Sequence, residues 1–141
     1  MDETQASQHV LGFLFNEKLT KVVLIRKKRP EWQRNLLNGV GGKIEEGETS
    51  LNAMIRECRE ETGLVVPEWV YYCSLWPPGS HVAVFASTSD ICRARTMTDE
   101  EIVILNIDDM MLIVPNLTWL IPIAKDAIMN NNIITRVHYL N

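Results

Sequence analysis

The sequence lacks any apolar run long enough to cross a membrane. A spanning helix needs roughly 20 consecutive apolar residues, and no stretch of this chain approaches that length. The first residues, Met-Asp-Glu-Thr-Gln-Ala-Ser, are polar and acidic, whereas a secretory signal has a basic start and an apolar core. Cysteines are few, and the three present follow neither zinc-knuckle nor redox-pair spacing: Cys58, Cys73 and Cys92. We therefore expect a cytoplasmic protein with no membrane contact.

Positive charge is also in short supply. The chain has 14 Lys and Arg against 18 Asp and Glu, a net charge of −4. Because proteins that coat nucleic acid neutralise phosphates with Lys and Arg, we expect no nucleic-acid partner. The histidines lack metal-ligand spacing and receive no predicted role: His9, His81 and His138. The sequence is compatible with a homodimer.

What the sequence does contain is the composition of a folded globular domain. Its 141 residues are 46% hydrophobic and 23% charged, and we expect a single domain over 1–141 with a polar tail at 1–7. Apolar runs and turn residues predict strands at 10–15, 22–25, 69–76, 81–86, 102–105 and 133–140, helices at 49–62 and 117–129, and an irregular stretch over 30–42. The fold class is therefore α/β (α+β), a sandwich of helices and sheet.

Helix 49–62 has clear boundaries. Thr49 or Ser50 can cap its N-terminus and Gly63 can end it. Three glutamates on this helix, Glu57, Glu60 and Glu61, are spaced i, i+3 and i+4, so their side chains project from one face. Their mutual repulsion makes sense if divalent cations sit between them, since Mg²⁺ prefers oxygen ligands and completes its shell with water and substrate phosphates.

The segment from Gly42 to Leu64 resembles the Nudix box: Gly, five residues, Glu, seven residues, Arg-Glu, an aliphatic residue, any residue, Glu-Glu, any residue, Gly, aliphatic. The matching positions are Gly42, Glu48, Arg56, Glu57, Glu60, Glu61, Gly63 and Leu64. Cys58 replaces the usual branched aliphatic residue, which affects packing rather than chemistry. The resemblance implies a Nudix-type α/β/α sandwich with a mixed central sheet.

The resemblance also implies a role for the matching charged residues. Glu57, Glu60 and Glu61 would bind Mg²⁺, for which Mn²⁺ can substitute, and Glu57 is a candidate for activating the attacking water. Arg56 and Glu48 would hold each other and orient the carboxylates.

Residues around the start of the box and in a later loop extend this implied site. Gly41 and Gly42 would bring bare backbone close to the metal and the phosphates, and Lys43 would contact a substrate phosphate. The family often takes one more carboxylate from a later loop. Here Glu100 and then Glu101 are favoured for that role, with a solvated acidic loop as the alternative.

The substrate is less closely defined. The stretch from Asn38 to Lys43 resembles the nucleoside triphosphatase branch that removes oxidised purine nucleotides, in which such an Asn contacts the base. Asn38 is either that contact or a turn residue before Gly39. The branch's acidic residues near the last helix are missing, which leaves Asn116 or Trp119 as substitutes, although core packing is favoured for Trp119. Trp32 either stacks on a base or packs.

We therefore expect a small-molecule nucleotide as the partner, with a nucleoside triphosphate converted to the monophosphate and pyrophosphate. The alternative substrates are ADP-ribose, NADH or a dinucleoside polyphosphate, because ADP-ribose enzymes of this family often have a proline some fifteen residues past the box, and Pro77 and Pro78 lie near that distance. A non-catalytic nucleotide sensor is the alternative from another class. The basic run 26–29 is interpreted as a solvated strand edge rather than a polyphosphate attractor.

Overall fold

The computed structural model describes residues 7–130 and 134–139. Its elements, in chain order, are β1 Ser7–Phe15, β2 Lys21–Arg26, β3 Leu37–Asn38, β4 Val40–Lys43, α1 Ser50–Thr62, β5 Val70–Trp76, β6 Ser80–Thr88, β7 Ile102–Asn106, α2 Leu117–Asn130 and β8 Thr135–His138. In this part of the chain, no helix is long and apolar enough to cross a membrane.

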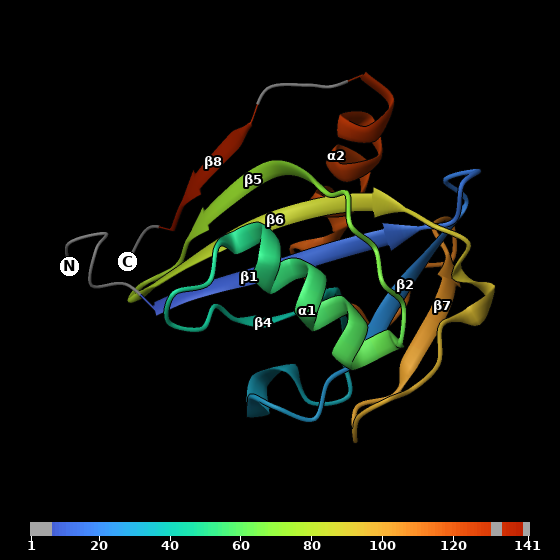
Figure 1. The fold of residues 1–141 in the computed structure, drawn as a ribbon, viewed down its shortest axis with the longest axis horizontal. Helices are drawn as coiled ribbons and strands as arrows, with labels where there is room; N and C mark the ends of the chain where they lie inside the picture. Colours follow the sequence, from blue (N-terminus) through green and yellow to red (C-terminus); the bar gives the residue numbers. More distant parts are fainter. Residues whose placement is uncertain (1–6, 131–133, 140–141) are drawn as a thin grey trace.

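The strands form one mixed sheet. Its main path runs β3-β2-β1-β6-β5-β8, while β4 pairs with β1 and β7 pairs with β2. The central strand β1 is parallel to β6 and antiparallel to both β2 and β4. Along one edge of β1, β4 pairs with the first half of the strand and β2 pairs with the second half. The sheet therefore divides into two branches at this edge (Figure 1).

Alternation along β1 separates two apolar layers. Val10 and Leu14 belong to the core beneath α1, whereas Phe13 and Phe15 belong to the core beneath α2. Figure 1 shows α1 in front of β1 and β4, with α2 behind β5 and β6. The predicted fold class, an α+β sandwich with a mixed central sheet, is confirmed by this arrangement.

The ends of α1 follow from its capping residues. Of the two N-caps that the sequence allowed, Thr49 is the one used, and its hydroxyl accepts a hydrogen bond from the Asn52 N–H at 3.1 Å. Gly63 ends the helix in the left-handed conformation, at φ 79°, and its N–H bonds the Arg59 carbonyl. The predicted boundaries of this helix are correct because both signals are local in sequence.

Three sequence predictions need correction. The stretch 30–42 is not irregular, because a 3-10 turn at Glu31–Gln33 is followed by β3 and most of β4. Strand β1 begins at Ser7, the last residue of the predicted polar tail. The final strand is Thr135–His138, shorter than the predicted 133–140, whose two end positions lie outside the described residues. The glycine-containing strand β4 was missed because its register with β1 comes from distant residues.

Candidate functional site

Arg56 organises the acidic face of α1. Its guanidinium donates two hydrogen bonds to Glu48, from Nε at 2.7 Å and from Nη2 at 2.9 Å. Nη1 lies 2.9 Å from Glu57 Oε1 and 3.2 Å from Glu60 Oε2, while Nη2 also bonds the Lys43 carbonyl. The hydrogen bond to Arg56 lowers the pKa of Glu48 to about 2. A single cation thus holds three carboxylates in place.

Glu61 is the buried acid of this face, with only 7% of its surface exposed. Its Oε1 accepts a hydrogen bond from the Gly41 N–H at 2.7 Å. Burial raises the pKa of Glu61 to about 8, and the negative charges of Glu57 and Glu100 add to the rise, against smaller opposing effects of the Gly41 N–H and Lys27. The surroundings of Glu61 therefore supply too little positive charge to stabilise its ionised form.

This donor set fits Mg²⁺. Among the described residues, no three acidic, histidine or cysteine side chains form a ready-made metal site. Mg²⁺ does not require one, because it keeps several waters and usually binds one or two carboxylates together with substrate phosphates. Burial raises the pKa of Glu57 as well as that of Glu61. A divalent cation would stabilise both carboxylates in their ionised form.

Two glycines connect this acidic face to the sheet. A Cβ on Gly41 would lie 2.1 Å from the Val10 carbonyl oxygen, and a Cβ on Gly42 would lie 2.5 Å from Glu57 Oε1. No side chain fits at either position without displacing β1 or the Glu57 carboxylate. Strand β4 therefore presents bare backbone between α1 and the rest of the site.

The loop before β7 brings Glu100 to the same region. Glu100 is 6% exposed; one oxygen accepts a hydrogen bond from the Lys28 N–H at 2.6 Å, and the other lies 3.3 Å from Lys27 Nζ. The negative charge of Glu100 adds to the rise in the pKa of Glu61. The alternative of a solvated acidic loop is wrong for Glu100, whereas its neighbour Glu101 is exposed.

The interpretation of the basic run 26–29 as a solvated edge holds for Lys28 and Arg29, which are exposed, but not for Arg26 and Lys27, which are partly buried. Three side chains of the run pair with the loop before β7, in the ion pairs Arg26–Glu101, Lys27–Glu100 and Arg29–Asp99. The paired residues lie at least 70 positions apart in the sequence, so local strand alternation could not reveal the pairing. Most of this charge is neutralised within the protein.

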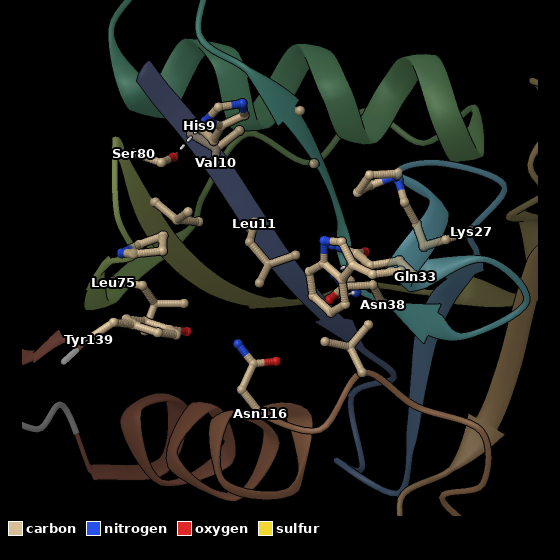
Figure 2. A pocket seen from close by; sticks show the side chains of 18 residues that line it. His9, Val10, Leu11, Lys27, Gln33, Asn38, Leu75, Ser80, Asn116 and Tyr139 are labelled. Atoms are coloured by element: carbon tan, nitrogen blue, oxygen red, sulfur yellow. Dashed lines mark hydrogen bonds between the residues drawn. The ribbon is translucent and has the colours of Figure 1, made fainter. Parts of the chain in front are cut away.

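A cavity of about 410 Å³ lies on the sheet face that α2 covers (Figure 2). Leu11 of β1, Val82 of β6 and the two glycines of β4, Gly41 and Gly42, line it. The loop after β2 adds Lys27, Pro30, Trp32 and Gln33, and β3 adds Asn38. The segment before α2 adds Val114 and Asn116. The cavity and the acidic face of α1 thus meet at the two glycines of β4.

Two asparagines face this cavity in different bonding states. Asn38 Oδ1 accepts a hydrogen bond from the Gly39 N–H at 2.8 Å, and its Nδ2 donates to Gln33 Oε1 at 3.1 Å. Asn38 therefore stabilises the turn before Gly39 and also lines the cavity. Asn116 Oδ1, by contrast, is buried and has no hydrogen-bond partner in the structure. Figure 2 shows Asn116 near the base of the cavity, between α2 and the sheet.

Of the remaining predicted residues, one lines the cavity and two lie elsewhere. Trp32 lines the cavity and is 64% exposed, so it is not a packed residue. Lys43 is exposed at the end of β4 and does not line the cavity. Trp119 packs against the core beneath α2, as the sequence favoured.

His9 lines the cavity, although its position in the sequence predicted no role for it. Its Nδ1 lies 3.2 Å from Ser80 Oγ, and it pairs with Lys43 across β1 and β4. No spacing signal could have found His9, because only the pairing of β1 with β4 and β6 brings it to this place. Gln33 and Tyr139 are further cavity residues that the sequence missed.

Comparison with known proteins agrees with this geometry. The family model for the NUDIX domain matches residues 7–106. The chain belongs to the Nudix family, whose hydrolases act on phosphorus-containing acid anhydrides. No curated protein matches its sequence significantly.

Solved structures share the fold at low sequence identity. The NUDIX domain of Shewanella oneidensis NrtR, complexed with ADP ribose, is 19% identical at a TM-score of 0.74, over 91% of this chain and 94% of that one. A MutT structure from work on Aliivibrio salmonicida and Vibrio cholerae is 21% identical at 0.62, over 89% and 93%. A MutT/nudix family protein from Enterococcus faecalis is 23% identical at 0.65, over 75% of this chain and 46% of that one, so this chain spans less than half of its length.

Proposed function

We propose that this chain is a Mg²⁺-dependent pyrophosphohydrolase that converts a ribo- or deoxyribonucleoside triphosphate to the monophosphate and pyrophosphate. The supporting observation is that the cavity and the carboxylates of α1 meet at Gly41 and Gly42. A nucleoside in the cavity would direct its phosphates past these glycines, where no side chain obstructs them, toward Glu57 and Glu61.

Each acidic residue has a distinct part in this proposal. Mg²⁺, when bound, would offset charge on the phosphates and on the departing pyrophosphate. Glu57, Glu60 and Glu61 would supply its oxygen ligands from α1, and Glu100 would add a fourth carboxylate from the opposite loop. Glu57 would also accept the proton of the attacking water, a role for which burial, by raising its pKa, makes it better suited than an exposed glutamate.

Positive charge supports the same arrangement. Lys27 lines the cavity and lies 3.3 Å from Glu100 Oε1, so its ammonium group would stand between that carboxylate and a bound phosphate. Lys43, the second residue of the box, would contact the phosphates from outside the cavity. Together these residues would attract an anionic substrate to a protein of negative net charge.

Hydrolysis in ¹⁸O-labelled water tests the proposed reaction. We expect label to enter the nucleoside monophosphate or the pyrophosphate, and we expect no orthophosphate, because attack occurs at an internal phosphorus and pyrophosphate leaves with its charge neutralised. Mass spectrometry of the products gives the answer directly. Label confined to orthophosphate, with a nucleoside diphosphate as the other product, would contradict the proposal.

A second candidate class of substrate is ADP-ribose, NADH or a dinucleoside polyphosphate. Pro77, one of the two prolines past the box, lines the cavity, and the similar NrtR domain is complexed with ADP ribose. A non-catalytic nucleotide sensor is the candidate of another class, but every box glutamate is present in this chain. A substrate panel in which the products are identified by chromatography separates all three, because a sensor would release no product from any substrate.

We expect Asn116 to distinguish between bases. Its buried Oδ1 has no partner, and such a group costs about 1–3 kcal/mol, which a base N–H that donates to it would recover. Asn116→Ala should therefore lower kcat/KM about 10-fold for the preferred nucleotide and less for poor ones. The matched control is Asn116→Asp, which keeps an acceptor and should retain more of the preference.

The same panel decides the role of Asn38. If its remaining amide hydrogen donates to a base, Asn38→Ala should reduce kcat/KM mainly for the preferred nucleotide. An equal loss on guanine, adenine, cytosine and uracil triphosphates, including oxidised purines, would limit Asn38 to the turn and to its contact with Gln33.

A further inference from the structure

The C-terminal strand contributes one wall of the cavity. Strand β8 pairs in parallel with β5, in the register Leu75↔Val137 and Trp76↔His138, and the Tyr139 N–H bonds the Trp76 carbonyl at 3.3 Å. Immediately beyond this pairing, Tyr139 lines the cavity together with Leu75. Figure 2 shows the Tyr139 ring beside Leu75, on the side of the cavity opposite Asn38 and Gln33.

The pleat of the sheet explains why Tyr139 faces inward. Leu75 and Val137 both pack toward the core beneath α2, and Tyr139, two residues beyond Val137, continues on the same face. Trp76 and His138 point to the opposite face, where their rings stack at 5.8 Å with an interplanar angle of 4°. A slip of one residue in β8 would break this stack and turn Tyr139 out of the cavity.

Trp76 also has a second ring contact that fixes its position. The His81 ring lies 4.1 Å from it, and His81 belongs to β6, the next strand of the sheet. The two ring contacts of Trp76, one tilted and one stacked, thus join β6, β5 and β8 on the sheet face opposite the cavity. By holding β8 in register, these contacts fix the position of the Tyr139 ring on the cavity side of the sheet. Tyr139 is 42% exposed, so its side chain is accessible to a ligand.

We infer that Tyr139 is a specificity-determining residue that packs its ring against the nucleoside of the substrate, and that the Trp76–His138 stack is the positioning contact that holds it there. This inference rests on the proposed function for the identity of the ligand as a nucleotide. An aromatic ring beside apolar Leu75 and Leu11 offers a stacking surface to any planar base. The ring touches the part of the substrate that does not react, so it acts on binding rather than on bond cleavage.

Binding of adenosine and guanosine monophosphates, measured by calorimetry on the full chain, tests the inference without catalysis. We expect Tyr139→Ala to weaken both on the order of 10-fold, while Tyr139→Phe binds nearly as wild type because the ring is retained. Ile134→Ala is the matched control, since Ile134 lies in the same C-terminal segment, is 43% exposed and does not line the cavity. It should bind as wild type.

Kinetics separate positioning from a general structural role. For Tyr139→Ala and for His138→Ala, KM for the nucleotide should rise by a similar factor with kcat nearly unchanged, and His138→Phe should restore KM by supplying a ring for Trp76. Thermal melts should agree within a few degrees for all variants.

Unchanged nucleotide binding in Tyr139→Ala, an equal loss in Ile134→Ala, or no nucleotide binding by the wild type would each overturn the inference. A wild type that binds nucleotides through Tyr139 but hydrolyses none would refute the proposed function and leave the inference standing.

Discussion

Replacing Glu61 with glutamine is expected to lower the rate of nucleotide hydrolysis at least about 100-fold at saturating Mg²⁺. The carboxylate that approaches Gly41 is lost, and with it several kcal/mol of the metal's stabilisation of charge in the transition state. Steady-state kinetics over a Mg²⁺ titration measures the effect. Glu60→Gln should also lose most activity, whereas Glu46→Gln, an exposed glutamate outside the site, should not.

The same substitution should leave the metal-free protein as stable as wild type or more stable. Burial raises the pKa of Glu61 from the usual 4.5 to about 8 in the folded protein, so ionisation is disfavoured by folding. The stability of metal-free wild type therefore falls as pH rises from about 4.5 to 8, and this loss is absent in Glu61→Gln. Thermal melts in EDTA from pH 5 to 9 should show the variant melting higher above pH 8. Full activity of the variant without added metal would contradict the metal role.

Arg56→Met should reduce both stability and activity. The guanidinium is the shared partner of Glu48, Glu57 and Glu60, so its removal leaves three carboxylates to repel one another. We expect a loss of about 2 kcal/mol in the free energy of unfolding, below the value for a fully buried pair because the side chain is 19% exposed. Activity should fall about 10- to 100-fold, as for a residue that orients metal ligands.

Arg56→Lys is the informative control. Lysine keeps the charge but cannot reproduce the two parallel bonds to Glu48, so stability should recover in part and activity should not. Urea unfolding gives the stability and a Mg²⁺ titration gives the metal dependence. If Arg56→Lys were as active as wild type, charge alone would matter and the orienting role would be wrong.

Elements whose signals are local could be predicted from the sequence. The i, i+3, i+4 spacing of the glutamates places them on one face of α1 whatever the helix packs against, and Thr49 and Gly63 fix its ends through their own hydrogen bonds and backbone conformation. The partnership of Arg56 with Glu48 was predictable from the family pattern, and the structure contains it. The apolar runs likewise located β1, β2, β5 and β6 to within a few residues.

The tertiary structure alone decided how these parts combine into a site. Strand β4 forms because Gly41 and Gly42 find partners on β1, about thirty residues away, and not because glycine favours a strand. The ion pair of Lys27 with Glu100 and the unpaired Oδ1 of Asn116 likewise depend on segments far apart in the chain. Tyr139 enters the cavity only through the register of β8 on β5. The register of strands and the contacts between distant loops depend on long-range packing, which short-range periodicity does not encode.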